Sequence, residues 1–310
     1  MIKLQNFSFL KPIIPRRIQI LIRRALINQK LPQYKHIWPI DPNSAKPPEG
    51  WNGWPKGKKF ALVLTHDVDT KKGHDKCHLL AKIEERLGFR SSFNFVAEDY
   101  QISRKLMQRL RDEGHEIGQH GINHVNPFRT KKYFLEQAEN INKYLSKWNA
   151  VGFRSPSMYH NLDWLHDLKI EYDASTFDTD PFEPQPDGAG TIFPFWVSNS
   201  MNQNGYVELP YTLPQDFTLF ILMKQKNIDI WTNKLDWIAT HGGMALFITH
   251  PDYMNFSENE CRHDEYPPKY YEDFLKYVNG NYKDEYWNVL PRNIANFWYT
   301  ITPKQAPQNG

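Results

Sequence analysis

Two short stretches of this sequence place carboxylates and imidazoles at spacings that suit metal-assisted chemistry. Asp67 and Asp69 follow directly after the apolar run 60–64. Because side chains alternate along a strand, both aspartates can point to the same side of its end. His120 and His124 are four residues apart, a spacing at which two imidazoles can reach one ion from a helical turn. Two carboxylates and two imidazoles supply three metal ligands and one base, the set that a metal-dependent hydrolase needs.

Each pair also has a simpler structural interpretation. Aspartates are common in turns, so Asp67 and Asp69 could cap the turn after the strand. Two close carboxylates repel, however, unless a cation or an arginine neutralises one of them. The chain has 12 histidines, so His120 and His124 could be surface residues. A carboxylate from a distant strand would favour the metal-binding interpretation over the structural one, because two imidazoles and one carboxylate form a recurrent metal-binding set.

Three more residues with chemical potential follow predicted strands. Arg154 precedes a Ser-Pro turn; it is either a surface charge or a fixed guanidinium that orients a carboxylate, with Asp67 as its expected partner. His250 follows the apolar run 244–249. It could be a buried structural residue, but a histidine that faces the site suits a general acid. Asp173 is expected to support the site through His250.

The apolar pattern predicts alternating strands and helices from residue 60 onward. Strands are expected at 60–65, 91–96, 115–120, 150–154, 171–176, 191–197 and 244–249. Helices are expected at 73–88, 103–111, 130–148, 228–240 and 268–278. This alternation is typical of parallel strands joined by crossover helices, in a barrel or a doubly wound sheet. In a barrel the strand ends share one rim, so the candidate residues would meet there.

The first 57 residues differ from the rest and are interpreted as an N-terminal extension, followed by a main domain at 58–300 and a tail at 301–310. Residues 15–30 predict a basic amphipathic helix. This helix could lie on an anionic membrane surface or pack on the main domain, and we rank packing slightly higher. Residues 31–59 are rich in Pro, Gly and Trp, so we expect them to wrap over the domain.

Composition limits the classes of protein that fit. The 310 residues are 40% hydrophobic and 24% charged, which suits one large globular domain or one domain with an appendage. The net charge of +3 is scattered, so we expect no nucleic-acid partner. The two cysteines, Cys77 and Cys261, form no disulfide framework or zinc knuckle pattern. No membrane-spanning run or secretory signal pattern is visible, and we expect a cytoplasmic protein or one peripheral to the inner face of a membrane.

Together the motifs resemble those of the polysaccharide deacetylase (NodB-homology) family of carbohydrate esterases. The resemblance covers roughly residues 58–252, and the motifs occur in the family's order: THDVD at 65–69, HGINH at 120–124, Arg154 and Pro156, YDAS at 172–175, and the apolar strand before His250. THDVD has an Asp-x-Asp form in place of the commoner adjacent pair. The resemblance implies an α/β fold, a distorted (β/α) barrel of about seven parallel strands.

The resemblance also implies roles for individual residues. Asp67 would be the base, and Asp69, His120 and His124 would bind one divalent metal ion, zinc in the first place, with cobalt or nickel as alternatives. The backbone N–H of Ser157 would donate to the oxyanion. The reaction implied is hydrolysis of an N- or O-acetyl group on an acetylated glycan, either a sugar polymer or a glycan intermediate. In this scheme Arg154 orients the base and His250 protonates the leaving group.

Two other functions fit the same residues. A deformylase or amidase that acts on a lipid-linked or small substrate would use the same metal site, and the helix at 15–30 would bring it to a membrane. A non-catalytic glycan-binding relative would keep the barrel, although binding alone needs neither a base nor an acid. The acidic segment 178–184 matches no motif and could border the substrate.

Overall fold

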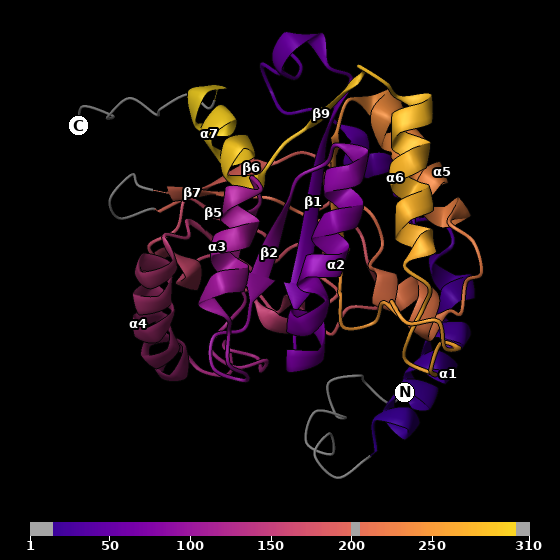
Figure 1. The fold of residues 1–310 in the computed structure, drawn as a ribbon. Coiled ribbons are helices and arrows are strands. Elements are labelled where there is room, and N and C mark those ends of the chain that lie inside the picture. Colours follow the sequence, from indigo (N-terminus) through magenta and orange to yellow (C-terminus); the bar gives the residue numbers. More distant parts are fainter. Residues whose placement is uncertain (1–14, 200–204, 302–310) are drawn as a thin grey trace.

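A sheet of mostly parallel strands forms the centre of the computed structural model, which describes residues 15–199 and 205–301 (Figure 1). Within these residues the strands are β1 (Phe60–Val68), β2 (Ser91–Phe95), β3 (Glu116–Gln119), β4 (Gly152–Phe153), β5 (Tyr172–Asp173), β6 (Phe195–Ser198), β7 (Gly205–Glu208), β8 (Met244–Thr249) and β9 (Tyr286–Asn288). Their order is β6-β7-β5-β4-β3-β2-β1-β8, and β9 pairs with the start of β1. Every pairing is parallel except that of β6 with β7.

The sheet curls into a distorted barrel. The seven strands from β7 to β8 in this order are all parallel. The chain that follows β7 joins the two ends, because Leu213 pairs in parallel with Phe247 of β8 and Tyr211 pairs with Phe177. The predicted α/β class, a distorted barrel of about seven parallel strands, is therefore confirmed.

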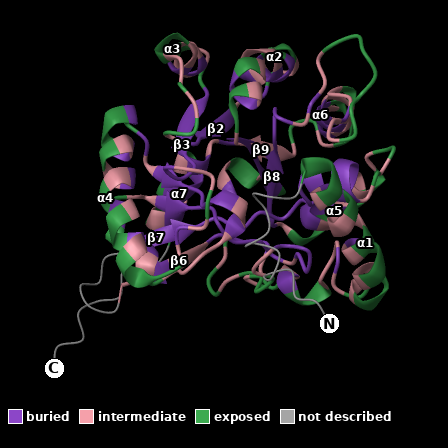
Figure 2. Cartoon of the chain, turned by 90° about the horizontal axis from the view of Figure 1, so that it is seen from below, coloured by how far each residue is buried: buried purple, intermediate pink, exposed green. Residues whose placement is uncertain are grey.

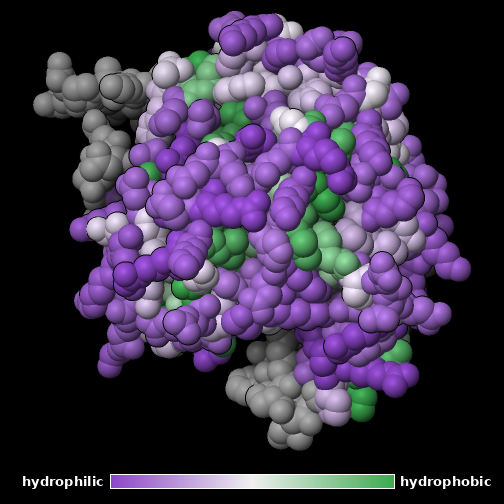
Figure 3. All heavy atoms as spheres, viewed as in Figure 1, coloured by the Kyte–Doolittle hydropathy of each residue, from purple (hydrophilic) through white to green (hydrophobic). Residues whose placement is uncertain are grey.

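Helices cover the outside of the sheet, and this explains why β1 is buried along its whole length. Figure 2 shows buried strands at the centre, surrounded by helices whose outer faces are exposed. The longer helices are α1 (Arg16–Tyr34), α2 (Lys71–Leu87), α3 (Arg104–Asp112), α4 (Lys131–Trp148), α5 (Asp229–His241), α6 (Lys269–Asn281) and α7 (Pro291–Ile301). Short helical turns are η2 (Pro42–Ala45), η3 (Pro55–Gly57), η4 (Pro156–Met158), η5 (Trp164–Asp167) and the π-helical η6 (Phe217–Leu222). The face seen in Figure 3 is mostly hydrophilic, with hydrophobic residues in small groups.

Some elements differ from the prediction. β1 continues to Val68, so Asp67 lies inside the strand and Asp69 directly after it. The strand expected at 191–197 is β6, which begins at Phe195 and is antiparallel to its neighbour. β7, β9 and α7 were not predicted. β7 and β9 have only four and three residues, too few to show a clear period.

The N-terminal extension packs on the main domain, as the preferred interpretation of its helix expected. Ile20 and Ile27 of α1 are buried, and Arg24 Nε donates to the carbonyl oxygen of Ile221 in η6 at 2.8 Å. Figure 1 shows α1 near the end of the barrel toward which β1 and β2 point. None of the helices in residues 15–199 and 205–301 is long and apolar enough to cross a membrane.

The segment after α1 wraps over the barrel. The Trp54 indole N–H donates to the carbonyl oxygen of Gly242 at 2.8 Å. The backbone N–H of Ile192 donates to the carbonyl oxygen of Ser44 at 3.0 Å. The division into 1–57, 58–300 and 301–310 stays a prediction, and most of the expected tail, 302–310, lies outside the described residues.

One buried lysine joins this wrap to the barrel and gives a test of the fold. Lys234 and Asp178 are at most 1% exposed at their side chains, and Lys234 Nζ contacts both Asp178 Oδ2 and the carbonyl oxygen of Pro39 at 2.5 Å. Lys234→Met would leave a buried carboxylate without its cation, so we expect the free energy of unfolding to fall by about 3–5 kcal/mol in urea titrations.

The matched control removes both charges. Lys234→Met combined with Asp178→Asn leaves no unpaired charge, so this double variant should lose less stability than the single one. A single variant as stable as the unchanged protein would contradict the assigned role of Lys234.

Candidate active site

The carboxyl ends of the strands open into a cavity of about 290 Å³. Seven of the eight residues predicted to act in a site converge at this end of the barrel. Asp67, Asp69, His120, His124, Ser157 and His250 line the cavity, and Arg154 lies directly behind Asp67. Parallel strands bring their ends to one rim, so residues far apart in sequence meet there.

Asp69, His120 and His124 form a set of candidate metal ligands. Asp69 Oδ1 lies 3.3 Å from His124 Nε2 and 3.5 Å from His120 Nε2, and the three ligand atoms lie within 4.8 Å of one another. Asp69 Oδ1 is buried and accepts no hydrogen bond from any residue that the structure describes. A buried carboxylate oxygen without a donor is costly, and a divalent cation would satisfy it. The donor set, two imidazoles and one carboxylate, fits zinc and similar metals.

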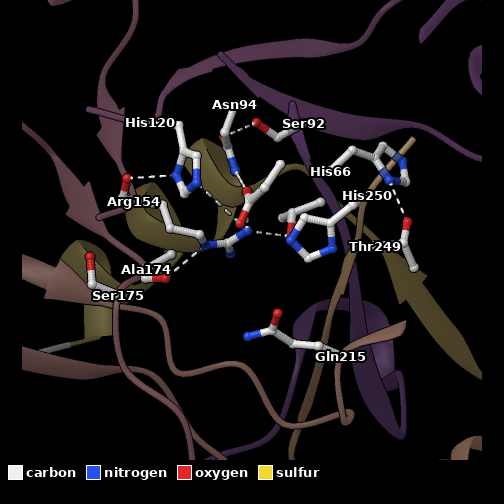
Figure 4. Close-up of polar contacts among 12 residues, drawn as sticks. His66, Ser92, Asn94, His120, Arg154, Ala174, Ser175, Gln215, Thr249 and His250 are labelled. Carbon is white, nitrogen blue, oxygen red and sulfur yellow. Dashed lines mark hydrogen bonds and ion pairs between the residues drawn. The ribbon is translucent and has the colours of Figure 1, made fainter. Parts of the chain in front are cut away.

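The hydrogen bond of His120 prepares its ring for this role. Its Nδ1 lies 2.9 Å from the carbonyl oxygen of Arg154, which only accepts, so Nδ1 carries the hydrogen (Figure 4). Nε2 is then left with a lone pair directed toward Asp69. Metal-binding histidines are usually held in this way, with one ring nitrogen donating to a carbonyl or carboxylate.

A second group of three possible ligands, Glu85, Glu113 and His115, also has buried polar atoms without a hydrogen-bond partner, but its histidine is in the wrong tautomer for a metal. The backbone N–H of Ser91 donates to His115 Nδ1 at 3.2 Å, so Nε2 of that neutral ring carries the hydrogen. A protonated nitrogen has no lone pair for a metal. Arg109 Nε also pairs with Glu113 Oε1 at 2.6 Å and already supplies a cation there.

The two histidines do not lie on a helical turn, so that part of the prediction is wrong. Residues after β3 form an irregular loop in which Gly121 has a φ of +81°, a conformation that favours glycine. Asp99 holds the loop, because its two carboxylate oxygens accept from the His124 N–H and from Asn123 Nδ2, both at 2.7 Å. The loop therefore delivers both imidazoles without helical geometry.

Asp67 is held as an ionised carboxylate beside this set. Its Oδ1 accepts from Arg154 Nη1 at 3.0 Å and from Asn94 Nδ2 at 2.8 Å, so the expected pairing with Arg154 is present. Its Oδ2 lies 3.9 Å from His120 Nε2. Burial raises the pKa of Asp67, but Arg154, His120 and His250 together lower it more, and the net pKa lies below the usual value.

Asp173 does not contact His250, so its predicted link to that residue is wrong. Its two oxygens accept from the N–H and hydroxyl of Ser175, at 2.9 and 2.8 Å. The Ser175 hydroxyl in turn accepts from the N–H of Ser155 at 2.8 Å. Asp173 therefore fixes the chain next to Arg154, one step away from the site.

The partner of His250 is Asp216, which the sequence analysis missed. Asp216 Oδ1 lies 2.7 Å from His250 Nδ1, and Oδ2 accepts from the His250 N–H at 2.8 Å and from the Tyr266 hydroxyl at 2.9 Å. Burial lowers the pKa of His250, but Asp216 raises it more, to about 10. No motif signals Asp216; its only hint is that it directly precedes the apolar run 217–223.

Ser157 presents its backbone to the cavity in an unusual conformation. Its φ is +55°, in the left-handed region that residues other than glycine seldom adopt, and Ser157 lines the cavity. Among residues 15–199 and 205–301, none accepts a hydrogen bond from its N–H. This N–H is therefore available to a substrate oxygen.

Comparison with known proteins supports the fold. No protein-family model and no curated protein matches the sequence. Solved structures that match include a protein from Mycobacterium smegmatis assigned as a polysaccharide deacetylase, at 17% identity and a TM-score of 0.62, over 83% of this chain and 96% of that one. PuuE allantoinase matches at 14% identity and a TM-score of 0.63, over 83% and 95%. A protein from Pseudomonas aeruginosa PAO1, also assigned as a polysaccharide deacetylase, matches at 15% identity and a TM-score of 0.58, over 80% of this chain and 93% of that one.

These likenesses show a shared fold. The chain adopts the NodB-homology fold of the polysaccharide deacetylases, which the order of its motifs had suggested. Because the identities are below one fifth, the roles of individual residues have to be argued from the geometry of this chain.

The candidate metal site can be tested by direct binding of zinc. His120→Ala and Asp69→Asn each remove one ligand, and we expect the affinity for Zn²⁺ to fall by more than the about 10–100-fold that loss of a ligand's supporting hydrogen bond costs. Titration calorimetry and metal analysis after dialysis measure this. Glu113→Gln is the matched control from the second group, and an equal loss of zinc in that variant would contradict the assignment.

Proposed function

We propose that this protein is a metal-dependent hydrolase that removes an acetyl group, N- or O-linked, from a sugar polymer or a glycan intermediate. The observation that carries the proposal is that an ionised carboxylate, Asp67, and a cationic imidazole, His250, lie beside one set of candidate metal ligands. Binding of a glycan needs neither group, so this arrangement argues against a non-catalytic relative. The fold shared with proteins assigned as polysaccharide deacetylases supports a sugar substrate.

Asp69, His120 and His124 would hold one divalent cation, with zinc as the first choice and cobalt or nickel as alternatives. When bound, such a cation polarises a carbonyl group and makes a water molecule more acidic. The protein contributes three ligands and an adjoining cavity, so the site keeps room for water and an acyl group.

Asp67 would remove a proton from the attacking water. Its Oδ1 is held by Arg154 and Asn94, which leaves Oδ2 on the side of the metal ligands to receive the proton. The lowered pKa keeps this carboxylate ionised at neutral pH. Arg154 is itself fixed by the carbonyl oxygen of Ala174 and the hydroxyl of Thr65, at 2.8 and 2.7 Å. The base is therefore oriented before a substrate binds.

The backbone N–H of Ser157 would stabilise the acyl oxygen, which becomes negative as the carbon becomes tetrahedral. His250 would then donate a proton to the departing nitrogen or oxygen of the sugar, while its Nδ1 stays on Asp216. In balance, one C–O bond to water forms and one C–N or C–O bond breaks. One water proton passes to Asp67, the other stays on the acid product, and the His250 proton goes to the sugar. The product ionises to acetate on release, and transfer of the Asp67 proton to His250 through solvent restores both groups.

An amidase or deformylase that acts on a small or lipid-linked substrate is the second candidate. The cavity of about 290 Å³ has α1 as one wall, and one structural match is an allantoinase. Both observations suit a compact substrate as well as a chain end.

The reaction itself can be tested with zinc-loaded protein and a panel of acetylated glycans, formylated sugars and short amides. We expect acetate to be released from at least one acetylated glycan. Formate release alone would favour the second candidate. Glycan binding without any released acid, at full metal occupancy, would overturn the proposal.

The division of labour between the two aspartates gives a sharper test. Asp67→Asn removes the base but keeps the hydrogen-bonding shape, so kcat should fall by about 10²–10⁴-fold. Its zinc content should remain near that of the unchanged protein. If Asp67→Asn lost zinc and Asp69→Asn kept it, the two roles would have to be exchanged.

Asp216 is a positioning residue whose effect should appear in the pH profile. His250 acts while protonated, so with its pKa raised to about 10 the activity should persist into alkaline pH and fall as the pH passes that value. Asp216→Asn removes the charge that raises the pKa, and the alkaline limb of kcat/KM should move toward neutrality. Asp216→Glu keeps the charge and should move it less; an unchanged limb in both variants would exclude this role.

A further inference from the structure

Helix α1 of the N-terminal extension forms one wall of the candidate active-site cavity. Five of its residues line that cavity, at positions that share one face of a helix: Arg16, Gln19, Ile22, Arg23 and Leu26. The arginine next to this face, Arg17, is exposed and does not line the cavity. The extension is therefore part of the site.

Two guanidinium groups of this wall meet at one aromatic ring. The central carbon of Arg23 lies 4.9 Å from the ring centre of Phe217, and that of Arg16 lies 5.4 Å from the same centre. Arg16 Nη2 also donates to the Tyr253 hydroxyl at 3.2 Å. By contrast, Arg24 on the other side of α1 uses its guanidinium on two backbone carbonyl oxygens, of Ile221 and His263.

No carboxylate in the described part of the chain is close enough to pair directly with these two charges. Neither Arg16 nor Arg23 forms an ion pair with any residue in the part of the chain that the structure describes. The segments 1–14, 200–204 and 302–310 contain no Asp or Glu side chain in their sequence. Two like charges at a cavity wall repel each other and favour an anion between them.

Glu183 is the carboxyl group with the clearest electrostatic effect on Arg23, but it is engaged elsewhere. Its Oε1 accepts from the Tyr211 hydroxyl at 2.9 Å and from Gln215 Nε2 at 2.6 Å. Burial and the nearby Asp180 raise the pKa of Glu183 to about 8, so at neutral pH it is mostly uncharged. The positive charge of the wall is therefore left for a ligand.

The wall lies on the side of the cavity where His250 acts. The rings of Phe217 and Tyr253 are 4.9 Å apart, and the Tyr253 ring is 5.2 Å from that of His250. Phe217 also directly follows Asp216, which holds His250. In the proposed reaction His250 protonates the leaving group, which is the sugar. An anion bound by the wall would therefore belong to the sugar part of the substrate.

We propose that Arg16 and Arg23 bind an anionic group, phosphoryl or carboxylate, carried by the sugar portion of the substrate. The inference rests on the proposed deacetylase function and narrows its substrate class from acetylated glycans in general to acidic ones. Guanidinium groups suit this task because their forked donors match phosphate and carboxylate oxygens.

The test compares three acetylated substrates that share one sugar: a neutral oligosaccharide, the same unit joined to a uronic acid, and the sugar 1-phosphate. We expect Arg23→Gln and Arg16→Gln to lower kcat/KM on the preferred acidic substrate by about 10-fold or more, mainly through KM, since each removes a charge-assisted contact. The loss on the neutral substrate should be smaller, because no charge-assisted contact is removed there. Added salt should raise KM for the acidic substrate alone.

Arg17→Gln is the matched control, because it removes the same charge from the same helix outside the cavity. Arg23→Lys keeps a charge and should recover part of the loss. Comparing kcat/KM for the uronic acid substrate with that for the sugar 1-phosphate identifies which anion is bound. The inference would be overturned if the protein had equal kcat/KM for acidic and neutral substrates and if Arg16→Gln and Arg23→Gln behaved like Arg17→Gln. Release of acetate in the same assays would still support the proposed function.

A binding measurement tests the anion site even if the proposed function fails. If no substrate releases acetate, the proposed function fails, but calorimetric titration with the unacetylated uronic acid and sugar 1-phosphate still reports on the wall. Binding of either that is lost in Arg16→Gln and Arg23→Gln but kept in Arg17→Gln would support an anion site. If the unchanged protein bound neither compound, the inferred anion site would be contradicted.

Discussion

Arg154 is the residue on which the arrangement of the site depends. Its side chain is 1% exposed and its positive charge is paired with Asp67, which is 3% exposed. Neither charge would be tolerable alone at that depth. The pairing fixes β4 against β1 at the strand ends, and the backbone carbonyl oxygen of Arg154 also accepts from His120 Nδ1. One residue thus orients Asp67 through its side chain and His120 through its backbone.

The charges of the site divide into pairs and one remainder. Asp67 is balanced by Arg154, and the protonated His250 is balanced by Asp216. What remains is Asp69 beside two imidazoles, with one buried carboxylate oxygen that accepts no hydrogen bond from the described residues. A divalent cation would turn this remainder positive, and the guanidinium groups of α1 would add to it. The cavity as a whole would then select a negatively charged ligand, the property that the α1 wall suggests independently.

The sequence permitted prediction of those features that depend on local patterns. Alternation along β1 placed Asp67 and Asp69 on one side. His66, which directly precedes Asp67, is buried and bonds to Glu84 and Thr249 at 2.9 and 2.7 Å, so a polar residue inside the strand was mistaken for its end. Loop geometry after His120 could not be predicted from spacing, because it depends on a glycine φ and on Asp99.

Asp216 was beyond reach for a different reason. Its place beside His250 follows from the bridge between Leu213 and Phe247, a pairing across the closing edge of the barrel that no local pattern encodes. The contribution of α1 is of the same kind, because it comes from a segment outside the motifs. The strand ends carry the candidate reactive groups, whereas α1 forms a wall of the cavity beside them. Since α1 forms one wall of the cavity and places two guanidinium groups there, access and selectivity would change together wherever this helix is altered.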